Sequence, residues 1–150
     1  MRSPLRFAWA TAVLALLAAC AQMPQTVSPE DAAAKRFEPV AGQAVIYVYR
    51  LSFNYTPTML NVNGNAVGNF EAGTYYRLVV PPGEQVITGG GEDGGNIRLN
   101  VPAGGIAYVV NNVAGQNMAS VQSRFATVPA PQAQDDIRRC CTLVGGPLPR

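Results

Sequence analysis

From residue 44 to residue 123, short apolar runs alternate with turn signals, and this pattern limits the fold more than any other feature of the chain. The runs are rich in β-branched and aromatic residues and are too short for typical helices. About eight strands are predicted, at residues 44–51, 59–62, 65–70, 75–80, 84–88, 96–101, 106–111 and 118–123. Their spacing is typical of a small antiparallel β-sandwich-like domain rather than of alternating strands and helices.

The Asn63-Gly64 dipeptide predicts a tight hairpin between the second and third runs. Asparagine and glycine tolerate the two positive φ angles that a type I′ turn requires. A two-residue loop places Leu60 opposite Val67 and puts both on the same face as Val62. This hairpin is therefore expected to bury one apolar face.

Two further predictions concern the order of the strands. Residues 44–51 form a continuous apolar run, which predicts a central strand covered on both faces. Pro82 and Gly83 suit the two central positions of a type II turn. Residues 84–88 are therefore expected to pair back, antiparallel, on residues 75–80.

Short helices are predicted at both ends of the β domain. Ser28 supplies a capping hydroxyl and Pro29 suits the first helical position, with acidic residues following in the first turn. This helix either docks on the domain or frays as part of a flexible stalk. Residues 127–132 are predicted to form a Pro/Ala linker, and residues 134–144 a terminal helix.

Residues 1–19 are predicted to be a signal peptide. Arg2 and Arg6 give the segment a basic start, and residues 8–19 are uncharged and rich in Ala and Leu. A permanent transmembrane helix needs about 20 apolar residues, so this shorter stretch favours a cleaved signal.

The signal segment ends in Leu17-Ala18-Ala19-Cys20, which resembles the lipobox of bacterial lipoproteins. The resemblance implies that the Cys20 thiol receives a diacylglyceryl group, and that Ala21, rather than Asp, directs the protein to the outer membrane. Two or more acyl chains suffice for stable membrane anchoring. The alternative is an ordinary secretory signal in which the cysteine is incidental.

The predicted domain organisation follows from these segments. It consists of the signal peptide at 1–19, a lipidated cysteine with a stalk or short helix at 20–42, the β-sandwich domain at 43–126, and a linker, helix and tail at 127–150. Removing the signal takes away two of 11 basic residues, so nine remain against nine acidic ones. Without a basic cluster, nucleic-acid binding is not expected.

Four successive motifs resemble one bacterial family. They are VIYVYR at 45–50, VNG with VG at 62–68, YYRL followed by VPPGE at 75–84, and GIAYV at 105–109. This succession resembles the bacterial lipoprotein family called domain of unknown function 2846, over residues 44–144. The resemblance implies a small β-sandwich-like domain in the cell envelope, but no activity. The chain departs from the family at Gln85, where the family often has histidine, and in a longer glycine-rich loop.

The residue types present exclude several catalytic classes. The chain has no histidine, so Ser/His/Asp and Cys/His mechanisms and His-ligated metal sites are excluded. Glu92, Asp93 and Asn96 lie in a glycine-rich loop that offers calcium ligands, but a plain hairpin tip is the favoured interpretation. No enzyme activity, metal or cofactor is predicted.

The adjacent pair Cys140-Cys141 is a candidate redox site. With Cys20 acylated, these two thiols pair with each other, pair with another chain, or stay free. A disulfide between neighbours closes a small ring of the more reducible kind, which suggests thiol-redox or soft-metal chemistry. The alternative is that one cysteine packs as a small hydrophobe and the other is inert.

Tyrosines form the other candidate site. Tyr47 and Tyr49 share one strand face, and Tyr75 or Tyr76 is expected to point outward. An exposed aromatic face would bind glycan or a partner protein, whereas half-buried sheet positions explain the same pattern. The leading hypothesis is a non-enzymatic binding or assembly module, anchored to the outer membrane and facing the periplasm. Its expected partner is an envelope protein or peptidoglycan.

Overall fold

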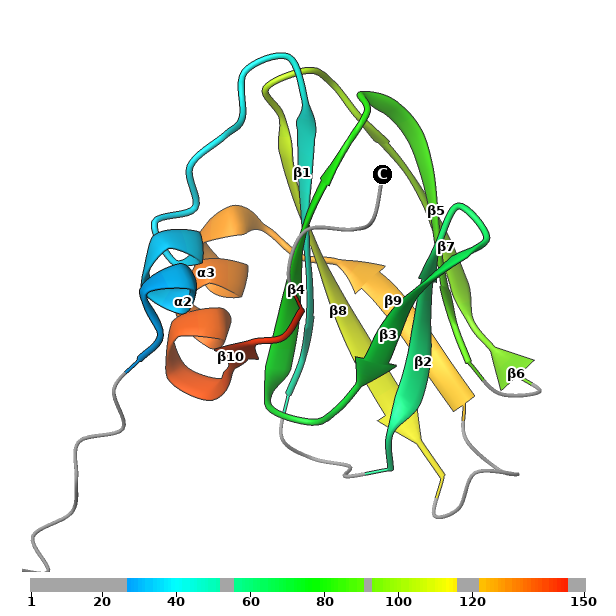
Figure 1. Ribbon diagram of the computed structural model, residues 1–150. Helices are drawn as coiled ribbons and strands as arrows, with labels where there is room; N and C mark the ends of the chain where they lie inside the picture. Colours follow the sequence, from blue (N-terminus) through cyan, green and yellow to red (C-terminus); the bar gives the residue numbers. More distant parts are fainter. Residues whose placement is uncertain (1–26, 52–55, 91–92, 116–121, 146–150) are drawn as a thin grey trace, which may run out of the picture.

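A computed structural model describes residues 27–51, 56–90, 93–115 and 122–145. The predicted signal peptide, Cys20, Glu92 and most of the predicted strand at 118–123 lie outside the described residues. Two β-sheets pack face to face, and two short helices lie against the larger sheet (Figure 1). The predicted small, mainly β, sandwich-like domain with short N- and C-terminal helices is confirmed.

The larger sheet has six strands in the order β10-β4-β1-β8-β9-β6. Their bounds are β10 Thr142–Leu143, β4 Thr74–Val80, β1 Ala44–Arg50, β8 Ile106–Ala114, β9 Gln122–Thr127 and β6 Asp93–Gly94. All seven residues of β1 are buried, which confirms the predicted central strand. The prediction that the strands are antiparallel is wrong for this sheet, which is mixed because β1 pairs antiparallel with β4 but parallel with β8. A parallel pair needs a long crossover, and the chain between β1 and β8 supplies it; this stretch contains the whole smaller sheet together with β4 and β6 of the larger one.

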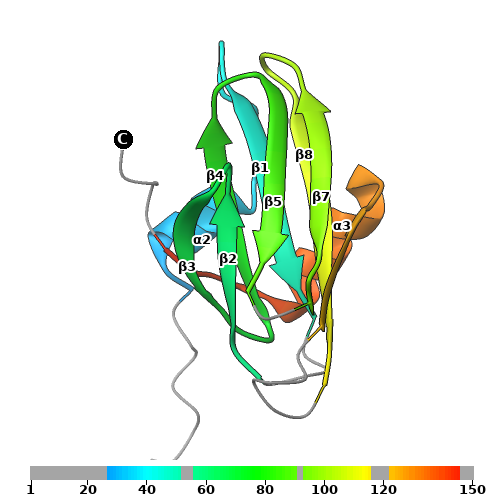
Figure 2. The same ribbon diagram turned by 90° about the vertical axis from the view of Figure 1, so that its right-hand side faces the viewer.

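The smaller sheet has four strands in the order β3-β2-β5-β7. Their bounds are β3 Asn65–Phe70, β2 Thr58–Val62, β5 Gly83–Gly89 and β7 Asn96–Val101. Figure 2 looks onto this sheet, and the helices α2 (Pro29–Ala34) and α3 (Ala130–Cys140) lie behind the sandwich. The smaller sheet therefore covers one face of the larger sheet while the helices cover the other.

The β2–β3 hairpin has the predicted turn and a different register. Asn63 and Gly64 have φ angles of 52° and 81°, as a type I′ turn requires. Leu60 pairs with Gly68 instead of the predicted Val67, because the register shifts by one residue after Leu60. This irregularity still lets Val67 pack against the inner core. The predicted apolar face is thus present, although one predicted pair is wrong.

The predicted pairing of residues 84–88 with residues 75–80 is wrong. β4 belongs to the larger sheet and β5 to the smaller one, where β5 pairs with β2 and β7. Pro81 and Pro82 between them have no N–H groups to extend a ladder. Gly83 has the positive φ expected for the turn, 117°, but the chain crosses to the opposite sheet instead of folding back.

The C-terminal boundaries also differ from the prediction. Within the described residues β9 spans Gln122–Thr127 and so extends past the predicted end at Ser123, and α3 begins at Ala130 rather than at Gln134. Pro129 is the N-cap and Pro131 lies in the first helical turn, where a missing N–H costs nothing. The prolines that suggested a linker therefore begin the helix. α3 is followed by β10, a strand that the sequence did not predict.

The molecule has two hydrophobic cores, one on each face of the larger sheet. The first lies between the sheets and contains the even-numbered residues of β1, such as Ile46 and Val48. The second lies between the larger sheet and the helices and contains the odd-numbered ones, such as Tyr47. Ala34 and Phe37 belong to this second core, so α2 docks on the domain rather than forming part of a free stalk.

One side of the sandwich is closed by backbone hydrogen bonds through Gly95. Its carbonyl accepts from the N–H of Gly89 in β5 at 3.0 Å, and its own N–H donates to the carbonyl of Ser123 in β9 at 2.9 Å. Gly95 therefore links a strand of the smaller sheet to a strand of the larger one. A Cβ added at Gly89 would lie 2.5 Å from the Ser123 Cβ, so this close approach depends on glycine.

Candidate functional site

The tyrosines predicted to form an exposed binding face are buried. Tyr47 and Tyr75 have no exposed surface, Tyr49 is 1% exposed and Tyr76 is 4% exposed. β1 and β4 are covered on both faces, so Tyr76 points into the core between the sheets while the other three point toward the helices. The prediction of an exposed aromatic face is therefore wrong, because strand periodicity does not reveal whether a second layer covers the outward face.

The buried tyrosines position the two helices. The Tyr47 hydroxyl donates to the carbonyl of Ala34, at the end of α2, at 2.7 Å, and accepts from Arg77 Nε at 3.0 Å. The Tyr49 hydroxyl donates to the Asp136 carboxylate in α3 at 2.9 Å. Burial, with the Asp136 charge adding to it, raises the pKa of Tyr49 above its ordinary value. These phenols are thus neutral anchors rather than binding or reactive groups.

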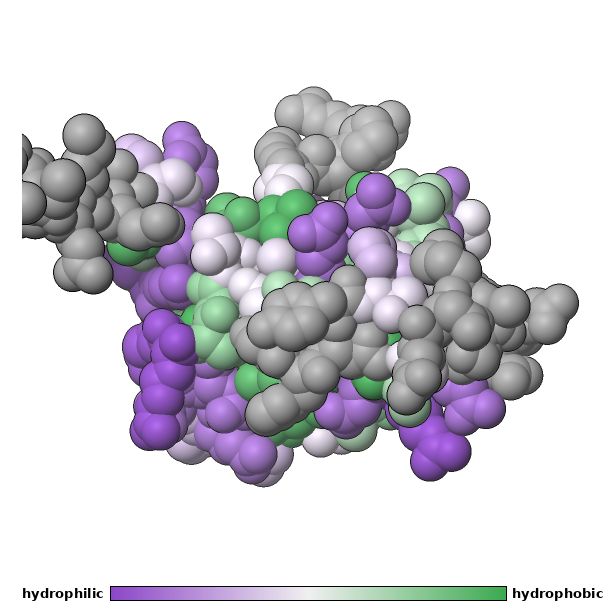
Figure 3. Space-filling model, turned by 90° about the horizontal axis from the view of Figure 1, so that it is seen from below, coloured by the Kyte–Doolittle hydropathy of each residue, from purple (hydrophilic) through white to green (hydrophobic). Residues whose placement is uncertain are grey.

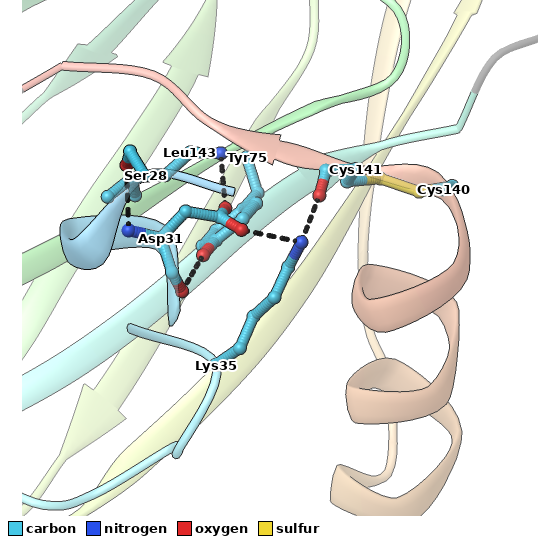
Figure 4. A network of polar contacts seen from close by, with 7 residues as sticks. All are labelled: Ser28, Asp31, Lys35, Tyr75, Cys140, Cys141 and Leu143. Carbon is cyan, nitrogen blue, oxygen red and sulfur yellow. Dashed lines mark hydrogen bonds and ion pairs between the residues drawn. A yellow bond between two sulfur atoms is a disulfide. The ribbon is translucent and has the colours of Figure 1, made fainter. Parts of the chain in front are cut away.

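The predicted helix cap is present and leads to a buried acid. The Ser28 hydroxyl accepts from the Asp31 N–H at 3.1 Å, and Pro29 occupies the first turn of α2. This start turns Asp31 inward, so that it is only 2% exposed (Figure 4). In the sequence Asp31 stands out only as a first-turn acid, and no local pattern indicates its burial.

Asp31 joins α2 to the C-terminal strand β10. One carboxylate oxygen accepts from the Leu143 N–H at 2.8 Å, and the other lies 2.8 Å from the Lys35 ammonium (Figure 4). Burial alone would raise the pKa of Asp31, but its hydrogen bonds, first those from Lys35 and Leu143, and the Lys35 charge together outweigh burial and hold that pKa below the ordinary 3.8. The carboxylate is therefore stabilised in its charged form.

Lys35 links this ion pair to the cysteines. Its ammonium donates to the carbonyl of Cys141 at 2.7 Å and lies 5.7 Å from the centre of the Tyr75 ring. The spacing of Asp31 and Lys35, four residues apart on a helix, was the available sequence signal for the pair. The contact with Cys141 spans 106 residues and could not be read from any local pattern.

Cys140 and Cys141 are joined to each other by a disulfide (Figure 4). Of the three states that the sequence left open, the structure has the intramolecular pair. Cys140 is the last residue of α3 and is partly exposed, whereas Cys141 is 4% exposed and belongs to the core under the helices. The Cys141 Sγ lies 3.6 Å from the carbonyl oxygen of Arg50. The disulfide therefore has one accessible side and one buried side.

A second cluster missed by the sequence analysis lies at the end of the sandwich where β1 and β8 end. It consists of four buried polar residues from four strands: Arg50, Thr58, Asn111 and Ser123. The Arg50 guanidinium donates to the carbonyls of Phe70 and Thr56, both at 2.7 Å, and burial lowers its pKa. The only sequence feature that pointed to Arg50 was its position as a charged residue at the end of an apolar run.

The rest of this cluster is incompletely hydrogen-bonded. Within the described residues, the Thr58 and Ser123 hydroxyls and both amide atoms of Asn111 have no partner. Leaving a buried polar group without a hydrogen-bond partner costs about 1–3 kcal/mol. Seen from that end, the described surface has small hydrophobic areas separated by hydrophilic ones (Figure 3).

The described ranges contain neither a metal-ligand group nor a membrane-spanning helix. No group of three or more Cys, Asp or Glu side chains comes together there as a metal site. Two of the three predicted calcium-loop residues are the first residues of strands: Asp93 begins β6 and Asn96 begins β7. None of the described helices is both long and apolar enough to cross a bilayer.

The comparisons with known proteins give no relative for this chain. No family model, no curated protein and no solved structure matches it. The resemblance to domain of unknown function 2846 is accordingly supported by its motifs alone, and stays a prediction.

Proposed function

We propose that the protein is a lipid-anchored, non-enzymatic binding or assembly module of the bacterial cell envelope. The observation that carries this proposal is the Leu17-Ala18-Ala19-Cys20 sequence at the end of the apolar segment. Acylation of Cys20 would tether residues 20–150 to the periplasmic side of the outer membrane. A compact β-sandwich is a suitable module for such a tether, and its partner would be an envelope protein or peptidoglycan.

The chemistry of the described residues supports a binding role over catalysis. Asp31, Tyr47 and Tyr49 are used to fasten the helices to the larger sheet. The partner surface is not the tyrosine face, because that face is covered. Crosslinking of the lipidated protein in cells, with the crosslinked residues located by mass spectrometry, would identify the surface that the partner occupies.

Replacing Cys20 by serine should release the protein from the membrane completely. The serine hydroxyl cannot form the thioether that carries the diacylglyceryl group, so acylation is lost; the variant is made behind a secretory signal that is cleaved without lipidation, so that no apolar segment holds it in the membrane. Membrane fractionation and the intact mass of the protein measure this. The Cys140→Ser, Cys141→Ser double variant is the matched control and should stay in the membrane with its acyl mass. A Cys20→Ser protein that still sediments with membranes would contradict the anchor.

A second candidate function is thiol-redox chemistry or soft-metal binding at Cys140 and Cys141. The observation that favours it is the disulfide between two neighbours, of which one is partly exposed. Reduction would yield two adjacent thiols, which can exchange with other thiols or bind a soft metal ion.

This second function predicts that the disulfide is reducible in the folded protein. The Cys20→Ser form should take up no alkyl groups before reduction and two after treatment with a dithiol, as counted by intact mass. A sample that keeps its disulfide until it is denatured would contradict a redox role. Alkylation without any reductant would show that the thiols are free.

A further inference from the structure

The two residues of the disulfide differ in their exposure to solvent. Cys140 ends α3, directly after Arg138 and Arg139, and all three lie at the surface or partly exposed. Cys141 turns into the core between the helices and the larger sheet, where only 4% of it is exposed. A reagent from solvent therefore meets Cys140 first.

A hydrogen-bond acceptor for a thiol at Cys141 lies on the buried side of the disulfide. The Cys141 Sγ lies 3.6 Å from the Arg50 carbonyl oxygen, within reach of an S–H donor. The Lys35 ammonium, 2.7 Å from the Cys141 carbonyl, fixes the backbone of Cys141 while its charge is paired with the Asp31 carboxylate. Once the Cys141 sulfur has taken up a proton, the Arg50 carbonyl can accept a hydrogen bond from it.

We propose that Cys140-Cys141 is a thiol-exchange site with a fixed direction, in which an external thiolate attacks Cys140 and Cys141 is the leaving group. This inference rests on the second of the two proposed functions. The substrate class is a molecule with a free thiol that can approach the end of α3. Attack of the Cys141 thiolate on the mixed disulfide is the reverse of this step, and it re-forms the Cys140–Cys141 bond while releasing the external thiol.

The exchange balances in two steps. A thiolate forms a bond to the Cys140 sulfur while the Cys140–Cys141 bond breaks, and the Cys141 sulfur leaves with the electron pair and takes a proton from water. A second thiol attacks the mixed disulfide, which releases the Cys140 thiol and a disulfide of the two substrate thiols. Two substrate thiols are oxidised, and the protein disulfide is reduced to two thiols.

Two single variants in the Cys20→Ser protein test the direction. Cys141→Ser leaves the accessible Cys140 thiol, and Cys140→Ser leaves the buried Cys141 thiol. With an aromatic disulfide reagent read by absorbance, we expect the Cys140 thiol to react at least about tenfold faster, because local opening must first expose Cys141. In urea the two rates should become similar, which serves as the control for folding. Similar rates in the folded variants would overturn the proposal.

Glutathione identifies the attacked sulfur in the protein with both cysteines. After brief reaction and acid quenching, peptide fragmentation should place the glutathione on Cys140. Glutathione found on Cys141 would overturn the direction while leaving the redox function intact. A protein that forms no mixed disulfide and is not reduced would remove the redox function itself, so the two failures are distinguishable.

Discussion

Replacing Gly95 by alanine should destabilise the protein by about 3 kcal/mol or more. An added Cβ would overlap the backbone carbonyl oxygen of Ser123 and lie 3.0 Å from its carbonyl carbon. Backbone atoms cannot rotate away as a side chain can, so β9 must shift from β5. That shift would break the two hydrogen bonds through which Gly95 links the sheets. Urea unfolding followed by circular dichroism measures the loss.

Gly104→Ala is the matched control for this substitution. Gly104 has a positive φ of 72°, but a Cβ there would meet nothing within 4 Å. Only the backbone preference is then lost, at about 1–2 kcal/mol. Equal losses for the two variants would show that β9 is free to move, and would contradict the tight closure through Gly95.

Replacing Asp31 by asparagine should cost about 3 kcal/mol near neutral pH, the usual result of removing one partner of a buried ion pair. The substitution keeps the size of the side chain but removes the charge that Lys35 and the Leu143 N–H share. The matched control is Asp135→Asn, because Asp135 also pairs with a basic residue four positions later, Arg139, but at the surface. That variant should lose no more than about 0.5 kcal/mol. Equal losses would contradict the structural role of Asp31.

The stability difference between wild type and Asp31→Asn is also expected to depend on pH, in a direction that the pKa of Asp31 sets. Because the pKa of Asp31 is lower in the folded protein than its ordinary 3.8, the carboxylate stabilises the fold at pH values above the unfolded pKa. This contribution disappears as the pH falls through the folded pKa. The free-energy difference between wild type and Asp31→Asn should therefore shrink below about pH 4. A difference that stays constant down to about pH 2 would contradict the pKa shift.

Local sequence patterns predicted the elements of this fold better than their partners. The Asn63-Gly64 turn and the all-buried strand β1 follow from residues that are close together in the chain. The partner of β5 does not, because Pro81-Pro82-Gly83 fits both a hairpin turn and a crossing between sheets. Only the packing of the complete sandwich decides between them.

The candidate site was predictable in part for the same reason. The adjacent cysteines stand out in any inspection of the sequence, and their pairing was one of the expected states. The Asp31 carboxylate joins α2 to β10 by accepting a hydrogen bond from Leu143, and no local pattern could predict this contact because Leu143 is 112 residues away. The tyrosines were misassigned because β4 has covering layers on both sides, which no alternation within YYRL can report.

The parallel pairing of β1 with β8 has a consequence for the order of folding. The strand at the centre of the larger sheet must wait for a neighbour that lies about sixty residues later in the chain. β4 then receives its outer neighbour only from β10, at Thr142–Leu143. During synthesis the apolar strand β1 is therefore complete long before β8, which pairs with it, has been made. The native sandwich closes only when almost the whole sequence is available.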